Sequence, residues 1–506
     1  MSYLGAPPAA PNEAPPSGDS SSEIPVWVVV VAAFLALALA ATLAFVLLKP
    51  DHTAPTAAPA PPAPSYPSHW DRRIAPYARI AAKERGLRFL HPVPVRFLSP
   101  RKFAKTLVTE DKDLSRNDRI QLAHATGQLR ALGLIGGAVD LLRATNDFQS
   151  GAVDAYYSFK DKRITVRGHH VTPAVKETLV HELTHVLQDQ HFHIGDRLKK
   201  LGKESEHGPD TSAGSVLDAI VEGDATRVQH LYASSLEPRQ RRALAASDRA
   251  EVAGATHRIS KVPPVVVALM SAPYTLGEAL VQTAATSGGN GAVDTLFRHP
   301  PTHESALLDP LRVLAGSTAA AKVDVPALHA GEKKFESGEL GVLTWYLMLA
   351  QRLPLAQALA AADGWGGDAY VGFQHGGTTC VRTAFTGRTA GDTGRMYAAL
   401  QGWEAAAPGI PASVTRSGDV VQFQSCDPHD AADVGKDDSQ AALALVDTRN
   451  VIGVSLVGSG ASAGLAGCVA SRLVQTYSVQ QLTDPTFGTG DPAVVARIQQ
   501  MAAACR

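Results

Sequence analysis

The chain has 506 residues, of which 45% are hydrophobic and 19% are charged. This length allows two or three domains, and this composition is typical of a globular protein with a substantial apolar core. The formal net charge of −1, without a basic stripe or an RNA-binding motif, excludes an electrostatic nucleic-acid binder, so we expect no nucleic-acid partner.

An uncharged apolar run at residues 24–48 is the first feature along the chain. As a helix it would extend about 37 Å, which exceeds the roughly 30 Å hydrocarbon core of a bilayer. A cleavable signal peptide would have a shorter apolar region and a basic leader, whereas residues 1–23 contain no Lys or Arg. We therefore predict a disordered leader at 1–23 and a transmembrane helix at 24–48.

A Pro/Ala-rich linker is predicted at residues 49–69. Residues 50–67 contain seven prolines and would form a semi-extended stalk of about 55 Å. Such a spacer suits a domain that is held away from a membrane. Under the positive-inside rule, Lys49 directly after the apolar run favours an orientation in which the leader lies outside the cell.

The sequence His181-Glu182-Leu183-Thr184-His185 is the most informative stretch of the chain. Residues at i and i+4 share one face of a helix, so His181 and His185 can reach one Zn²⁺ ion through their imidazole nitrogens. Glu182 lies about 100° round the helix, beside the metal rather than on it. A carboxylate in that position can act as a general base toward a water whose pKa the metal lowers.

The residues around this motif predict a helix preceded by a hairpin. Thr172-Pro173 is typical of an N-cap followed by the first helical residue, and apolar residues recur every four positions from Val175. Upstream, residues 155–159 and 163–166 read as two strands joined by a turn. An edge strand here could hold an extended peptide by main-chain pairing.

A catalytic zinc site needs a third protein ligand and an open position. His191 stands where an HExxHxxGxxH motif has its third histidine, but the residue that should be glycine is Gln188. Without a glycine to break it, the helix continues and turns His191 about 240° away from His185. His191 therefore stays an open but disfavoured alternative.

Glu222 is the favoured third ligand. It lies within Asp218-Ala219-Ile220-Val221-Glu222-Gly223-Asp224-Ala225-Thr226, which reads as a second helix. Asp218 and Thr226 flank Glu222 at i−4 and i+4, where they could orient a histidine from behind the metal. The sequence therefore predicts a zinc site made of His181, His185 and Glu222.

The segments HELTHVLQDQHF, at 181–192, and VEGDAT, at 221–226, resemble the gluzincin-type zinc metallopeptidases. They resemble more closely a group of membrane-anchored metallopeptidase-like proteins of actinobacteria. The likeness covers roughly residues 150–380 and continues through Pro273-Tyr274-Thr275-Leu276-Gly277, 288–294, Pro300-Pro301-Thr302-His303-Glu304 and 364–368. In that family the Pro-Pro-Thr segment usually continues with small hydroxyl residues, and this chain departs from the pattern at His303.

The resemblance implies a zinc metallopeptidase domain with an α/β part over the zinc helix, a largely helical part below it, and substrate between the two. It also implies peptide-bond hydrolysis, with a downstream His or Tyr steadying the oxyanion. Tyr274 and His303 are the candidates for that donor. In the alternative interpretation Tyr274 simply packs and His303 caps a helix after Pro301.

The predicted fold class is α+β and mainly α-helical. We expect the metallopeptidase-like domain at 70–368, with amphipathic runs at 119–143 and 340–362, and a small α+β domain at 369–506 with short strands at 370–373 and 374–377. All four cysteines lie at or after residue 380 and contain no CxxC pair, so disulfides are expected rather than a second metal site. Three pairings are open, and a cross-strand Cys380–Cys426 bridge with a second bridge from Cys468 to Cys505 is plausible.

The stalk, the cysteines and the resemblance together favour a cytoplasmic N-terminus and extracytoplasmic C-terminal domains. The function predicted is a zinc metallopeptidase that is anchored to the cell membrane by one helix and acts on peptide or protein substrates of the cell envelope or the secreted pool. The alternative is a non-catalytic envelope scaffold or binding protein on a metallopeptidase fold that keeps zinc for structure. A base beside the metal, Glu182, favours the enzyme.

Overall fold

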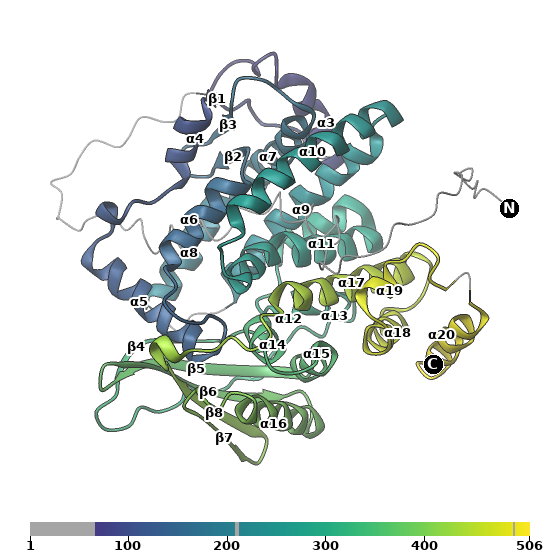
Figure 1. Ribbon diagram of the computed structural model, residues 1–506. Helices are drawn as coiled ribbons and strands as arrows, with labels where there is room; N and C mark the ends of the chain where they lie inside the picture. Colours follow the sequence, from purple (N-terminus) through teal and green to yellow (C-terminus); the bar gives the residue numbers. More distant parts are fainter. Residues whose placement is uncertain (1–65, 208–211, 489–490) are drawn as a thin grey trace, which may run out of the picture.

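A computed structural model describes residues 66–207, 212–488 and 491–506. Within these ranges the protein is a mainly helical α+β structure with two sheets, one at each end of a central set of helices (Figure 1). The fold class predicted from the sequence is confirmed at this level. The predicted leader, transmembrane helix and most of the linker lie outside the described residues.

The helices account for most of the described chain. In order they are α3 Ala75–Arg85, α4 Pro100–Leu107, η1 Asp111–Asp113, α5 Arg116–Ala131, α6 Leu141–Ala152, α7 Pro173–Phe192, α8 Ile194–His207, α9 Ala213–Ser235, α10 Pro238–Ile259, α11 Pro264–Arg298, α12 Ser305–Leu308, α13 Leu311–Leu314, α14 Val342–Ala350, α15 Leu355–Asp363, α16 Ala390–Ala405, η2 His429–Ala431, α17 Ser439–Gly458, α18 Ala463–Thr476, α19 Val479–Leu482 and α20 Pro492–Ala503.

The smaller sheet contains the predicted hairpin. It has the order β1-β3-β2, in which β1 Val95–Leu98 runs parallel to β3 Arg163–Arg167 and β2 Ala155–Ser158 runs antiparallel to it. The hairpin prediction is therefore confirmed, and β2 is an edge strand. Alternate residues of β2 are buried, so one face of the sheet covers α7.

Helix α7 begins as the sequence predicts. The Thr172 side chain accepts a hydrogen bond from the Val175 N–H, and Pro173 occupies the first helical position. The helix then runs without a break to Phe192 and ends at His193, which adopts a left-handed conformation with φ 53°. Most of α7 is buried because the β2–β3 hairpin, α3, α9 and α10 pack around it.

Helices α9 and α11 cross at two glycines. A Cβ built on Gly277 would lie 1.9 Å from the backbone oxygen of Ala219, and a Cβ on Gly223 would lie 2.1 Å from the Gly277 carbonyl carbon. Only residues without side chains permit this approach.

Helices α11 and α17 are each long and apolar enough to cross a membrane, judged by length and composition alone. In α11, however, 72% of the most apolar stretch is buried inside the protein, where it forms part of the core.

The larger sheet has the order β4-β5-β6-β8-β7 and lies at the bottom of Figure 1. Its neighbouring strands are all antiparallel. Helices α14 and α16 pack their aromatic residues against one face, through contacts of Trp345 and Trp403 with Phe423. The strands are β4 Lys333–Gly338, β5 Trp365–His375, β6 Thr378–Gly387, β7 Ala412–Ser417 and β8 Val420–Cys426.

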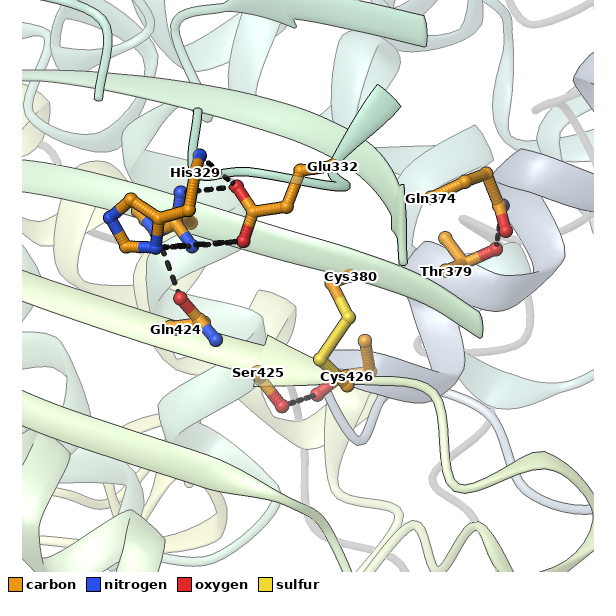
Figure 2. Close-up of a disulfide and its surroundings, with 10 residues drawn as sticks. His329, Glu332, Gln374, Thr379, Cys380, Gln424, Ser425 and Cys426 are labelled. Atoms are coloured by element: carbon orange, nitrogen blue, oxygen red, sulfur yellow. Dashed lines mark hydrogen bonds and ion pairs between the residues drawn. A yellow bond between two sulfur atoms is a disulfide. The ribbon is translucent and has the colours of Figure 1, made fainter. Parts of the chain in front are cut away.

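Two disulfides are present, Cys380–Cys426 and Cys468–Cys505, which is one of the three pairings that the sequence left open. Cys380 and Cys426 are direct cross-strand partners on β6 and β8, and Figure 2 shows their bridge on the sheet. The second bridge joins Cys468 on α18 to Cys505, just after α20. Such bridges persist in oxidising compartments and indicate that this part of the chain is extracytoplasmic.

One hydrophobic cluster extends through most of the described chain, from Leu98 to Val474. It includes residues on both sides of the predicted domain boundary at 368/369. Strand β5, which contains that boundary, pairs with β4, and α17 packs along α11. The division into domains at 70–368 and 369–506 stays a prediction.

Candidate metal centre

Three buried side chains from α7 and α9 converge on one point. His181 and His185 lie one turn apart on α7, and Glu222 faces them from the middle of α9. Their ligand atoms all lie within 4.8 Å of one another. Glu222 Oε2 is 3.2 Å from His181 Nε2 and 3.3 Å from His185 Nε2, and the three residues are 3%, 1% and 3% exposed in chain order.

The donor set fits a zinc ion. Two imidazole nitrogens and one carboxylate oxygen are the protein ligands of many catalytic zinc sites. His185 Nε2 is also buried, and it forms an ion pair with Glu222 Oε2 at 3.3 Å. Besides this ion pair the nitrogen makes no well-aligned hydrogen bond in the described part of the chain, and a metal ion between the two atoms would satisfy both of them.

The electrostatics of the three groups favour a cation between them. Burial alone would lower the pKa of His185, but Glu222 and then Glu182 outweigh it and raise that pKa to about 9. Burial would likewise raise the pKa of Glu222, but His185 and His181 lower it to about 2. The pKa of His181 is lowered, chiefly by burial. Glu222 is thus ionised, and its negative charge favours a positive charge next to the two imidazoles.

Glu182 lies beside this group, where the motif predicted it. Its Oε2 accepts a 2.6 Å hydrogen bond from the backbone N–H of Tyr157 on β2, and the residue is 1% exposed. Burial raises the pKa of Glu182 to about 8, against the opposing influence of His185. A cation bound next to it would favour the ionised carboxylate.

His191 does not join the group. Because α7 continues past Gln188, His191 projects toward the segment after α3, where its Nε2 lies 2.7 Å from the backbone oxygen of Arg88. The geometry therefore brings Glu222, and not His191, to the two histidines of the motif.

The two candidate oxyanion donors lie in different places. Tyr274 on α11 is buried, and its ring stacks on that of His181 with centroids 6.1 Å apart. His303 instead pairs through Nδ1 with Glu339 Oε2 at 2.7 Å, and the Ser212 hydroxyl also bonds to Glu339. Ser212 precedes the first turn of α9, about 15 Å along the helix from Glu222, so the contacts of His303 are remote from the metal centre.

Two glutamines that were not predicted from the sequence contact the histidines. Gln229 Oε1 is 3.1 Å from His181 Nδ1, and Gln188 Oε1 is 2.9 Å from His185 Nδ1. The expectation that Asp218 and Thr226 would orient a histidine is wrong. Thr226 Oγ1 is buried without a hydrogen-bond partner in the described part of the chain, and the Nδ1 atoms of both histidines face the two glutamines instead of Asp218.

Spacing could have identified these glutamines. Gln188 follows the second histidine by three residues, and Gln229 follows Glu222 by seven, so each shares a helix face with the ligand before it. A polar residue on a buried ligand-bearing face is a signal for a supporting contact.

No family model matches the chain, and comparison with curated proteins and with solved structures gives no match either. What the structure defines is therefore a mainly helical α+β protein with two disulfides and a buried His-His-Glu group that could hold a metal ion.

Proposed function

We propose that this protein is a gluzincin-like zinc metallopeptidase. The observation that carries the proposal is the convergence of His181, His185 and Glu222 within 4.8 Å, with Glu182 beside them. A structural zinc site is normally closed by four protein ligands, whereas three ligands leave a position for water or substrate. The donor set and the adjacent carboxylate together favour hydrolysis over a purely structural ion.

When bound, zinc would polarise a substrate carbonyl and lower the pKa of a water. His181, His185 and Glu222 would hold it. Glu182 would take a proton from the attacking water and return it to the leaving amine. Tyr274, whose ring stacks on His181, is the better placed of the two candidate oxyanion donors, and His303 is the weaker one.

Strand β2 supports a peptide as substrate. It is the edge of its sheet and lies against α7, and the N–H of Tyr157 points to Glu182 rather than to β3. An extended peptide could pair with this edge and place a bond near the metal centre. The substrate we propose is a peptide or protein of the cell envelope or the secreted pool.

The proposed setting is the outer side of the cell membrane. The disulfides support an oxidising compartment, and the apolar run at 24–48 with the Pro/Ala-rich linker at 49–69 supports an anchor and a stalk. The N-terminus would then be cytoplasmic.

A non-catalytic envelope scaffold that keeps zinc for structure is the second candidate. The burial of the centre, with Glu182 1% exposed and already bonded to the Tyr157 N–H, favours it. In that case Glu182 would fasten β2 to α7 and would have no chemical role.

Metal content and hydrolysis of the full chain test the proposal. We expect one zinc per chain in the wild type and in His191→Ala, and none in Glu222→Ala, by mass spectrometry of the metal. Glu182→Gln should keep zinc but lose cleavage of a mixture of unstructured peptides. A zinc-free wild type would refute the metallopeptidase, and a Glu182→Gln variant that cleaves as fast as wild type would exclude the general base. Zinc binding without any cleavage by the wild type would favour the scaffold.

A further inference from the structure

The side-chain amide of Gln188 has its orientation fixed by its neighbours. Its Nε2 donates to the backbone oxygen of Val221 at 2.9 Å and to Asp224 Oδ2 at 3.1 Å. Because both of these partners can only accept, the amide nitrogen must face them and Oε1 must face His185 Nδ1. All the atoms of this arrangement are buried.

Gln188 in turn fixes the proton on His185. Nδ1 faces only an acceptor, so it keeps its hydrogen whether His185 is neutral, protonated or bound to metal. The nitrogen that can exchange its proton for a metal is then Nε2, which is the atom that faces Glu222. The amide thereby selects the ligating nitrogen and the plane of the ring.

Asp224 is held in place by two arginines. Arg85, at the end of α3, donates from Nε to Asp224 Oδ2 at 2.6 Å, and both side chains are fully buried. Arg227 donates to Asp224 Oδ1 at 3.1 Å. Because Arg85 also bonds to Asp294 on α11, the carboxylate is fastened to α3, α9 and α11 together and cannot turn away from Gln188.

The arrangement at His181 differs. Gln229 Oε1 accepts from His181 Nδ1, and Gln229 Nε2 faces Glu177 but makes no well-aligned hydrogen bond within the described residues. This contact constrains the amide less tightly than the two hydrogen bonds that Gln188 donates. The two metal-site histidines therefore have unequal support, and the stronger support is at His185.

We propose that Gln188 and Asp224 are positioning residues, which together hold His185 with Nδ1 protonated and Nε2 directed at the metal. The proposal rests on the zinc site proposed above. Neither residue contacts the metal or the substrate. Their effect is on metal affinity, because an imidazole that is free to rotate or to change its tautomer must be ordered when the ion binds.

Zinc affinity of the full chain, measured by competition with a chelating dye, is the first test. Gln188→Met keeps the side-chain length but removes the acceptor, and we expect affinity to fall 10- to 100-fold, about the loss usual for such supporting contacts. Gln190→Met is the matched control, since Gln190 lies on the same helix and bonds to the backbone of Leu90 and His91 instead. It should bind zinc as tightly as wild type.

Variants at Asp224 and Gln229 separate positioning from general stability. Asp224→Ala removes an acceptor of the Gln188 amide and should weaken zinc binding. Asp294→Asn alters the other carboxylate partner of Arg85 but is not a hydrogen-bond partner of Gln188, so it should retain near wild-type affinity. Gln229→Met should lose less than Gln188→Met. Equal affinity in Gln188→Met and Gln190→Met, or an equal loss in Asp224→Ala and Asp294→Asn, would overturn the proposal.

A proton resonance in the metal-free protein keeps this test distinct from that of the proposed function. The Nδ1–H of His185, protected by Gln188 Oε1, should give an exchange-protected imidazole signal in nuclear magnetic resonance spectra of ¹⁵N-histidine-labelled chain. The signal should persist in Gln190→Met and disappear in Gln188→Met. If wild type bound no zinc but showed this pattern, the proposed function would fail and the positioning would stand; if the signal did not depend on Gln188, the positioning would fail.

Discussion

Gly277→Ala should separate helices α9 and α11 at their crossing. An ideal Cβ on Gly277 would lie 1.9 Å from the Ala219 backbone oxygen, whereas real Cβ atoms stay beyond about 3.0 Å from other heavy atoms. The backbones would thus have to move apart by about 1.1 Å to accommodate one methyl group. Helix backbone, unlike the end of a flexible side chain, cannot rotate out of the way.

The cost can be estimated from this geometry. Overpacking of a well-packed interior typically costs about 1–3 kcal/mol, and an obstacle made of backbone places Gly277→Ala at the upper end, about 3 kcal/mol. Glu222 precedes Gly223, the other glycine of the crossing, so the same displacement shifts the carboxylate relative to the histidines. We therefore expect weaker zinc binding together with lower stability.

Urea unfolding of the full chain measures the stability, with Gly214→Ala as the matched control. Gly214 lies on α9 too, but a Cβ there would have no atom within 4 Å. Alanine favours helix over glycine by about 0.5–1 kcal/mol, so the control should be unchanged or slightly more stable. A Gly277→Ala protein as stable as Gly214→Ala would refute the close crossing.

Two further predictions concern the larger sheet and the C-terminus. Arg382 donates two hydrogen bonds, of 2.7 and 2.9 Å, to Glu332, which is labelled in Figure 2, and these lower the pKa of Glu332 to about 2. The pair therefore stabilises the fold above about pH 4.5, and this contribution is lost as the pH falls to 2. Urea unfolding should then show Glu332→Gln about 2 kcal/mol less stable than wild type at pH 7 and nearly equal to it near pH 2, and an equal deficit at both would contradict the assignment. The Cys468–Cys505 bridge closes 37 residues and can contribute up to about 4 kcal/mol to the docking of α20. Replacing both cysteines by alanine should speed amide exchange in α20 while zinc affinity stays the same; unchanged exchange would show that packing alone holds the helix.

Local signals in the sequence predicted the framework of the site well. The Thr172-Pro173 start of α7 depends on one cap and one fixed φ, and the β2–β3 hairpin depends on alternation and a turn, so both are decided by adjacent residues. The choice of Glu222 over His191 followed from helix continuity, because Gln188 cannot end a helix as glycine would. These arguments need no knowledge of the tertiary fold.

Element boundaries were predicted less well, for reasons that are also local. The run at 340–362 is two helices, α14 and α15, because Pro354 interrupts it. The run at 119–143 likewise contains two helices, separated by Gly133 and Gly137 with positive φ. The strands expected at 370–373 and 374–377 belong largely to one strand, β5, whose pairing with β4 continues to Gln374 and with β6 to His375.

Contacts between distant segments could not be read from the sequence. His303 forms a hydrogen bond with Glu339, 36 residues away in the sequence, and Arg85 donates one to Asp224, 139 residues away. Nothing in the neighbouring residues specifies either partner. The support of His185 by Gln188 is short-range, but its significance depends on Asp224 and therefore on how α7 and α9 pack.

Because one hydrophobic cluster extends from Leu98 to Val474, the protein cannot be divided into fragments without exposing part of that cluster. Truncation after residue 368 would cut β5 in its first half and remove β6 and α17, and so would expose to water the apolar surface of α11, the helix that carries Tyr274. A shortened gene product ending there would be prone to aggregate, whatever the chemistry of its histidines. Replacement of residues 369–506 by another sequence would likewise require matching changes in the residues of α11 and of the larger sheet that pack against them.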